Sequence, residues 1–304
     1  MIYRVSHLTE YVYTAPVSSS HHLLHLLPRR LPRQKSRWEE LTIEPGPARQ
    51  HECVDAYGNR ATFIEIQEPH RRLAVLSRSE IDLVPAEPTF PTIAPPWEVV
   101  QEQARQARHP EQFEATEFVF NSPYVQPSQG VLEFALGSFT PRRPCVEAAI
   151  DLMHRIHAGF IYDSQATNVS TPVDEVLEKR RGVCQDFAHL ALGCFRSLGL
   201  PARYVSGYLV TAVLGQPRLI GADASHAWVQ TFCPGVGWID LDPTNDVIPS
   251  DKHITVAYGR DFGDVTPLSG VIMGGGRHKL RVVVDVMPLP AETDEIERTS
   301  VDRL

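Results

Sequence analysis

The chain has 304 residues, a formal net charge of −8, and 42% hydrophobic and 22% charged residues. This composition is typical of globular proteins and excludes disordered, collagen-like and coiled-coil chains. No segment has the roughly 18 to 20 uninterrupted apolar residues of a membrane helix, and the N-terminal residues alternate polar and apolar instead of forming a signal peptide. We therefore expect a cytoplasmic protein without a membrane partner. The scattered basic residues and negative net charge argue against nucleic acid as a partner.

The cysteines favour free thiols over a disulfide framework or a zinc ribbon. They are five in number, widely spaced and without a C-x-x-C pair. Most of them are expected to be reduced thiols in a hydrophobic core. The five are Cys53, Cys145, Cys184, Cys194 and Cys233.

Residues 1–84 read as short alternating segments separated by turn signals such as Tyr57-Gly58-Asn59. This pattern predicts an all-β N-terminal domain. A proline cluster between Pro85 and Pro96 then indicates a stiff connector, followed by a helix that begins near Trp97. We assign residues 85–138 to this connector and helical segment.

After Ser138 the hydrophobic period changes from two toward 3.6, which predicts helices. Helical segments are expected in CVEAAIDLMHRIHAGF, after Thr171-Pro172, and in CQDFAHLALGCFRSLG, which glycines bound on both sides. Strands ARYVSGYLV, HAWVQTF and GWIDLD follow, and KLRVVVDVMPL forms a C-terminal strand. The predicted fold class is α+β, with a core over 139–288 that includes the C-terminal strand. Residues 289–304 are expected to be a disordered acidic tail.

Cys184 opens the third of these helices, on the side of its apolar stripe. The backbone N–H groups of a first helical turn are unpaired, and the helix end carries partial positive charge, which stabilises a thiolate. Gly182 before it permits a tight backbone entry. A buried structural cysteine is the competing interpretation, so the thiol alone does not establish a nucleophile.

A nucleophile also needs a base, and the base needs a group that orients it. His226 begins one strand of a predicted hairpin, and Asp242 ends the other. A turn centred between Pro234 and Gly235 places His226 beside Asp242, and places Asp240 opposite Val229. Asp242 is therefore expected to hold the imidazole and stabilise its charged form.

The other histidines are expected to have structural or surface roles. His189 lies five residues after Cys184, about 140° around the helix, so it cannot face the thiol. His154 with His157, and the cluster His21, His22 and His25, lack a nearby Cys, Asp or Glu at familiar ligand spacing. The sequence therefore predicts neither a metal site nor a cofactor.

These motifs resemble the transglutaminase-like superfamily, in its bacterial branch described as cysteine proteases. G-V-C-x-D-F-A, P-A-R-Y-V-S-G-Y, S-H-A-W and D-P-T-N occur in the family's order and spacing, and the resemblance is strong over roughly residues 140 to 265. The N-terminal β region resembles, more weakly, the small β domain that precedes this core in bacterial members. The resemblance implies a papain-like α+β core with Cys184 as nucleophile, His226 as base and Asp242 as third member.

The resemblance leaves the second oxyanion donor open. Animal transglutaminases supply it from a tryptophan upstream of the nucleophile, whereas the corresponding stretch here, residues 160–163, has none. Tyr162 could offer its hydroxyl there or pack in the core. Trp228 shares a strand face with His226 and either lines the cleft or packs. No calcium loop of D-x-[DN]-x-[DN]-G type is present, which argues against calcium dependence like that of the animal enzymes.

The sequence thus favours a thiol enzyme that hydrolyses peptide, isopeptide or side-chain amide bonds of a protein or peptide substrate through a thioester. The first alternative is protein-glutamine γ-glutamyltransferase activity, which differs only in using an amine as acceptor. The second is a non-catalytic binding or assembly factor that recruits a partner through the β domain.

Overall fold

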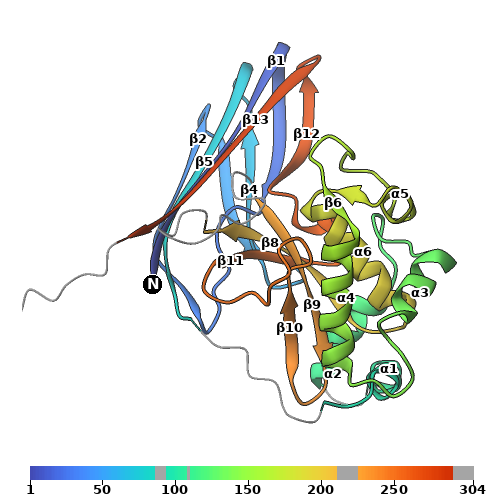
Figure 1. The fold of residues 1–304 in the computed structure, drawn as a ribbon. Helices are drawn as coiled ribbons and strands as arrows, with labels where there is room; N and C mark the ends of the chain where they lie inside the picture. Colours follow the sequence, from blue (N-terminus) through green and yellow to red (C-terminus); the bar gives the residue numbers. More distant parts are fainter. Residues whose placement is uncertain (86–93, 108–109, 211–224, 290–304) are drawn as a thin grey trace, which may run out of the picture.

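The computed structural model describes residues 1–85, 94–107, 110–210 and 225–289. It is an α+β structure with a β-rich N-terminal part, as the sequence predicts (Figure 1). Most of the proline-rich connector, residues 86–93, and the acidic tail from residue 290 lie outside the described residues, and so do the predictions made for them.

A seven-stranded antiparallel sheet forms the N-terminal part in the described residues. Its long strand β1 pairs with β5 and β13 along its first half, and with β4 and β12 along its second half. The alternation of the β1 sequence places Tyr3 and Val5 on the buried face. The strands of this sheet are β1 (Ile2–Leu24), β2 (Gln34–Glu44), β3 (Arg49–Val54), β4 (Arg60–Ile66), β5 (His70–Leu83), β12 (Leu268–Gly274) and β13 (His278–Leu289).

The assignment of the C-terminal strand to the core over 139–288 is wrong. Strand β13 pairs with β1 from Ile2↔Leu289 to Tyr13↔His278, and β12 pairs with the other half of β1. The strand itself was predictable from its β-branched run, but hydrophobic periodicity carries no information about which distant strand will be its partner. The chain therefore returns to the N-terminal sheet at its end.

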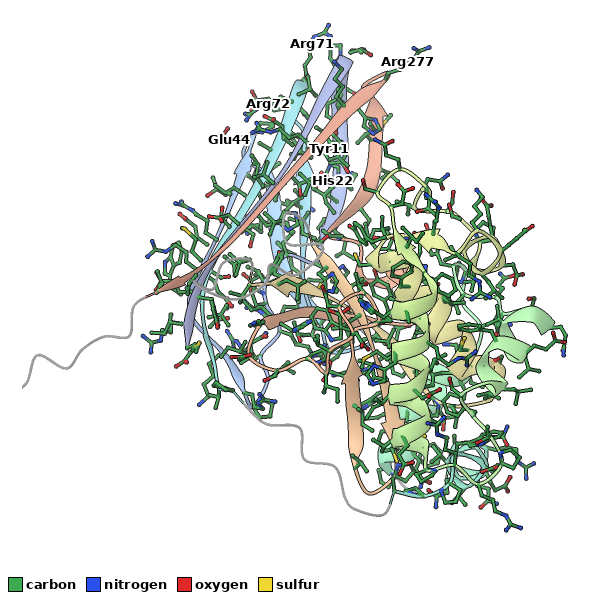
Figure 2. The ribbon with its side chains drawn as sticks, in the orientation of Figure 1. Tyr11, His22, Glu44, Arg71, Arg72 and Arg277 are labelled. Carbon is green, nitrogen blue, oxygen red and sulfur yellow. The ribbon has the colours of Figure 1, made fainter. Side chains whose placement is uncertain are left out.

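Cross-strand ion pairs cover the solvent face of this sheet. Arg72 contacts Glu10 at 2.6 Å and Glu44 at 3.1 Å, and Arg4 contacts Glu80 at 2.7 Å. Figure 2 shows Arg71, Arg72 and Glu44 on the part of the sheet that extends away from the helices. Exposed ion pairs of this kind each contribute little to the free energy of unfolding.

The second sheet has four antiparallel strands in the order β10-β9-β8-β11. Helices α4 and α6 pack on one face, and their apolar side chains form the main hydrophobic core with strand residues such as Val229 and Leu241. These elements are α4 (Cys145–Gly159), α6 (Cys184–Ser197), β8 (Ala202–Leu209), β9 (His226–Cys233), β10 (Gly237–Leu241) and β11 (His253–Gly259).

The N-terminal part covers the other face of this second sheet. Trp228, Val205 and Tyr258 form a separate apolar cluster there, with Leu31 packed against it. Gln34 bonds the backbone of Thr255 through both amide atoms, and Asn59 does the same with the backbone of Tyr258. The two parts are thus joined by buried hydrogen bonds as well as by apolar contact.

Short elements surround the helical face of the second sheet. Helices α3 and α5 pack on α6, and a two-stranded parallel ladder, β6 with β7, leads into it. In the described part of the chain no helix is both long and apolar enough to cross a membrane. The remaining elements are α1 (Trp97–Gln106), α2 (Pro110–Thr116), η1 (Glu117–Val119), α3 (Gln129–Leu136), β6 (Ile161–Tyr162), α5 (Val173–Lys179), β7 (Arg181–Gly182) and η2 (Phe262–Val265).

Candidate active site

Cys184 is the first residue of α6, as predicted, and is 9% exposed. Asp186 caps this end of the helix, because its Oδ2 accepts the backbone N–H of Val183 at 2.8 Å and the Thr167 hydroxyl at 2.6 Å. A Cβ atom at Gly182 would lie 2.7 Å from the Asp186 carboxylate, so only glycine fits there. The thiol is therefore held at a fixed point on the helix N-terminus.

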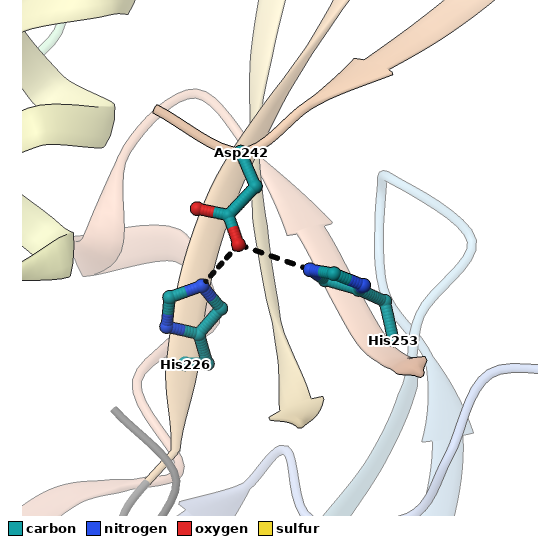
Figure 3. A group of neighbouring side chains, drawn as sticks. All are labelled: His226, Asp242 and His253. Carbon is teal, nitrogen blue, oxygen red and sulfur yellow. Dashed lines mark hydrogen bonds and ion pairs between the residues drawn. The ribbon is translucent and has the colours of Figure 1, made fainter. Parts of the chain in front are cut away.

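His226 begins β9, and its Nε2 donates to Oδ2 of Asp242 at 2.9 Å (Figure 3). Both side chains are fully buried. A carboxylate can only accept, so the imidazole proton must be on Nε2, which leaves Nδ1 for the thiol. Nδ1 has no hydrogen-bond partner among the described residues, and Cys184 lies near enough to the ring to raise the pKa of His226. In enzymes, hydrogen bonds between a nucleophile and its base are often long or poorly aligned until substrate binds.

The electrostatics favour a charged imidazole beside an ionised carboxylate. Burial alone would lower the pKa of His226, but the charge and hydrogen bond of Asp242, together with Cys184, raise it to about 10. Burial alone would raise the pKa of the Asp242 carboxyl, but His226 and His253 hold it well below its usual range. The site therefore supports an imidazolium over the neutral pH range.

Asp242 lies just beyond the end of β10, at the start of a turn. Its Oδ1 accepts the backbone N–H groups of Thr244 at 3.0 Å and Asn245 at 3.2 Å. Its Oδ2 also accepts the Asn245 side-chain amide at 2.8 Å. The backbone of Asp242 forms an isolated bridge with Val247, which closes the turn. The carboxylate is thus oriented by the turn itself.

The hairpin register differs from the prediction by one residue. Asp240 pairs with Gln230, and Leu241, not Asp240, lies opposite Val229. The tight connection between β9 and β10 shifts the centre of the turn by half a residue, which changes every pair. The contact between His226 and Asp242 forms nevertheless, because Asp242 leaves the strand and its side chain turns back to the imidazole.

His253 is a further member of the cluster that the sequence analysis did not identify. It begins β11, and its Nε2 lies 3.0 Å from the same Oδ2 of Asp242. The donor atoms of His226, Asp242 and His253 all lie within 4.8 Å of one another, a set of ligand types that a metal could use. Both Nε2 atoms are at hydrogen-bond distance from Oδ2 of Asp242, which only accepts, whereas Nδ1 of each ring has no partner among the described residues.

Comparison with known proteins places this chain in a family. The bacterial transglutaminase-like N-terminal region matches residues 3–82, and the transglutaminase-like superfamily model matches residues 136–243. The uncharacterized protein Rv2569c of Mycobacterium tuberculosis is 43% identical over 299 residues, which cover 95% of this chain and 94% of that protein. The chain belongs to the transglutaminase-like superfamily.

Two other similar proteins agree with this membership. A crystal structure from Cytophaga hutchinsonii, titled a "Putative Cysteine Protease", has a TM-score of 0.73 at 22% identity and covers 96% of this chain and 92% of its own, so the fold is shared. A protein-glutamine gamma-glutamyltransferase of Pseudomonas aeruginosa is 33% identical over 97 residues, which cover 31% of this chain and 14% of that protein.

Tyr162 lies on the short strand β6, beside the segment that leads into Cys184. It pairs with Gly182 in the parallel ladder of β6 and β7, two residues before Cys184, and it is 36% exposed. Burial raises the pKa of Tyr162, and so does the proximity of Cys184 and Asp186. The pairing of β6 with β7 thus places Tyr162 beside the segment that leads into α6.

Trp228 packs in the interior and does not line an open cleft. It is fully buried, and its indole N–H donates to Oδ1 of Asp240 at 2.8 Å. Its ring stacks near His226, with centroids 6.1 Å apart. Strand alternation placed Trp228 on the face of His226, but could not show that the N-terminal part covers this face.

The remaining histidines have supporting positions. His189 is buried, and its Nε2 accepts the backbone N–H of Phe262 at 3.2 Å. His154 contacts Asp246, and Nδ1 of His157 lies 3.0 Å from the carbonyl oxygen of Thr244. Helix α4 thus holds the turn that carries Asp242.

The other cysteines differ in exposure. Cys145, Cys194 and Cys233 are buried as expected, whereas Cys53 on β3 is exposed. All five are free thiols. Cys53 is exposed because every residue of β3 faces solvent, which the sequence analysis did not foresee.

Proposed function

We propose that this protein is a cysteine-dependent acyl-transfer enzyme that hydrolyses peptide, isopeptide or side-chain amide bonds of a protein or peptide. The observation that carries the proposal is the imidazole of His226, whose Nε2 is bonded to Asp242 at 2.9 Å while its Nδ1 is left for Cys184. A nucleophile, a base and an orienting carboxylate on three separate elements form the arrangement that amide attack requires.

Before attack in the first half of the reaction, the proton of the Cys184 thiol lies on Nδ1 of His226, which leaves a thiolate beside the imidazolium. The sulfur attacks the amide carbonyl carbon, a C–S bond forms, and the carbonyl electron pair moves to oxygen. Backbone N–H groups at the start of α6 are free of intrahelical partners and can donate to this oxyanion, and the Tyr162 hydroxyl supplies a second donor. The C–N bond then breaks, and the proton on Nδ1 passes to the leaving amine or ammonia.

In the second half, water attacks the thioester while Nδ1 of His226 takes one of its protons. The C–S bond breaks, the acid leaves, and the thiolate beside the imidazolium is restored. Asp242 stabilises the imidazolium in both halves, because its carboxylate is fully buried and accepts from Nε2. The proton that His226 gives to the leaving group in the first half is thus replaced from water in the second.

Exposure around the thiol favours water as the acceptor. Ile161 is 56% exposed and Tyr162 36% exposed, both on the strand that pairs beside Cys184. An amine must compete with water at about 55 M, which requires a dry acceptor channel. The exposed side chains of β6 therefore support hydrolysis of the thioester by water over transfer of the acyl group to an amine.

The test is turnover on glutamine-containing peptides, peptide amides and isopeptides, with the released amine or ammonia quantified. We expect wild-type protein and Cys53→Ala to be equally active, because Cys53 is an exposed thiol far in sequence from the site. Cys184→Ala should release nothing above background. Retained activity in Cys184→Ala would show that the thiol is not the nucleophile.

The alternative is γ-glutamyl transfer, which the name of the Pseudomonas relative favours over its 97 matching residues. A competition distinguishes the two reactions on one glutamine substrate, with a primary amine at millimolar concentration and both products quantified by mass spectrometry. We expect the free acid to exceed the amine adduct. If the adduct dominates, the transferase replaces the hydrolase.

A further inference from the structure

Two histidines donate to one oxygen of the triad carboxylate. Nε2 of His226 lies 2.9 Å and Nε2 of His253 lies 3.0 Å from Oδ2 of Asp242. His253 is 6% exposed, so this second hydrogen bond is shielded from solvent. A buried charge-assisted bond of this kind is among the stronger interactions in a protein.

His253 is placed to act on the carboxylate and not on the thiol. In Figure 3 the two imidazoles approach Asp242 from different strands, and their second nitrogens point away from each other. The His253 ring packs edge-on against Trp228 with centroids 5.1 Å apart. Its strand position is fixed by pairing with Leu209 on β8. The ring therefore has a defined orientation toward Oδ2.

We propose that His253 is a positioning residue of the triad, which fixes the Asp242 carboxylate and weakens its hold on the His226 imidazolium by donating to the shared oxygen. This inference rests on the proposed function, because it assigns His226 the role of the base. An oxygen that already accepts from His253 and from Asn245 has less negative charge available for His226.

The direction of the effect follows from the groups around the cluster. Cys184 on α6 interacts with His226, and the charge of Asp240 on β10 interacts with His253. The side-chain amide of Asn245 donates to the same Asp242 carboxylate. Replacement of His253 leaves these three residues in place. Without the His253 donor, Oδ2 becomes a stronger acceptor, and the imidazolium of His226 persists to higher pH.

The experiment follows alkylation of Cys184 by iodoacetate between pH 7 and 11, with the labelled site quantified by mass spectrometry. An anionic reagent is attracted by the imidazolium, so its rate falls when His226 loses its proton. In a plot of alkylation rate against pH, this fall forms the alkaline limb. We expect the midpoint of the alkaline limb to lie at a pH about half a unit or more higher in His253→Leu than in wild type. His253→Gln, which keeps an N–H donor at similar reach, should restore the wild-type limb.

Ile254→Val, at the next buried position of β11, is the matched control and should leave the limb in place. Circular dichroism at each pH checks folding. If His253→Leu does not fold, His253→Asn, whose amide is too short to reach Oδ2, replaces it. An unchanged or lowered limb in the donor-free variant overturns the inference, and so does a glutamine variant that behaves like leucine.

His226→Ala separates this inference from the proposed function. We expect the alkaline limb to disappear in that variant. If the limb persists without His226, the base of the proposed mechanism is wrong. If it disappears while His253→Leu matches wild type, only the role of His253 fails.

Discussion

A hydrogen bond of 2.9 Å joins Nε2 of His226, the first residue of β9, to Oδ2 of Asp242, which lies in the turn after β10. Helix α4 supports that turn through His154 and His157. The orientation of the imidazole therefore depends on packing between a helix, a hairpin and a turn, and not on the hairpin alone.

The two neighbouring aspartates are expected to have different roles. Asp242→Asn should lower kcat by about 10³ to 10⁴-fold, because an amide nitrogen facing Nε2 favours the wrong imidazole tautomer. Asp240→Asn should keep kcat within about tenfold of wild type, because Asp240 bonds Trp228 and Gln230 and not the imidazole. Asp240→Asn should instead lower the free energy of unfolding by about 1 to 3 kcal/mol, since an amide has one acceptor oxygen where the carboxylate accepts from Trp228 and Gln230 through two. Steady-state kinetics and urea unfolding of both variants check this, and a larger kcat loss at position 240 would contradict it.

The pair of His226 and Asp242 should make stability depend on pH. The pKa of His226 rises from 6.5 to about 10 on folding, so its contribution is complete below about pH 6.5 and is lost as the pH rises toward 10. The pKa of Asp242 is lowered on folding, so its contribution is present above about pH 4 and is lost as the pH falls further. The difference in unfolding free energy between wild type and Asp242→Asn should therefore be larger at pH 6 than at pH 10.

Urea unfolding at pH 6, 8 and 10 measures this difference. Ile239→Val, a buried substitution in the same hairpin without a titrating group, provides the control, and its difference from wild type should not change with pH. A wild-type advantage over Asp242→Asn that is constant from pH 6 to 10 would mean that the ion pair does not form.

Tyr162 is expected to act through its hydroxyl. Tyr162→Phe should lower kcat by about 10² to 10³-fold with little change in KM, because an oxyanion donor acts on the transition state. The phenyl ring keeps the packing, so the free energy of unfolding should be close to that of wild type. Steady-state kinetics test this on the best amide substrate found, and full activity in the variant would assign Tyr162 to packing alone.

The sequence predicted the parts of the site that depend on local structure. Gly182 and the apolar stripe located Cys184 at a helix start, and the hairpin brought His226 to Asp242 despite a one-residue error in register. His253 escaped notice because it meets Asp242 from β11, which joins the sheet on the far side of β8. Nothing in its local pattern identifies that neighbour.

The position of the C-terminal strand was unpredictable for the same reason. The pairing of β13 with β1 joins residues near the two ends of the described chain, and many strands of similar composition could have been its partner. The burial of Trp228 likewise depends on a distant segment, since Leu31 of the N-terminal part packs against its cluster. Local patterns fix an element and its faces, whereas long-range contacts decide what covers them.

Selective alkylation tests the activated thiol of Cys184, the central claim, without any knowledge of the substrate. Protein is treated with iodoacetamide near pH 6, and the rate at each cysteine is measured by peptide mass spectrometry in wild type and in His226→Ala. Cys53 is the internal standard, because it is exposed while Cys184 is 9% exposed, and exposure alone does not produce the reactive thiolate. We expect Cys184 to react first in wild type and to lose that advantage in His226→Ala. If Cys53 reacts as fast as Cys184 in the folded wild-type protein, or if His226→Ala leaves the rate at Cys184 unchanged, the account of this site is wrong.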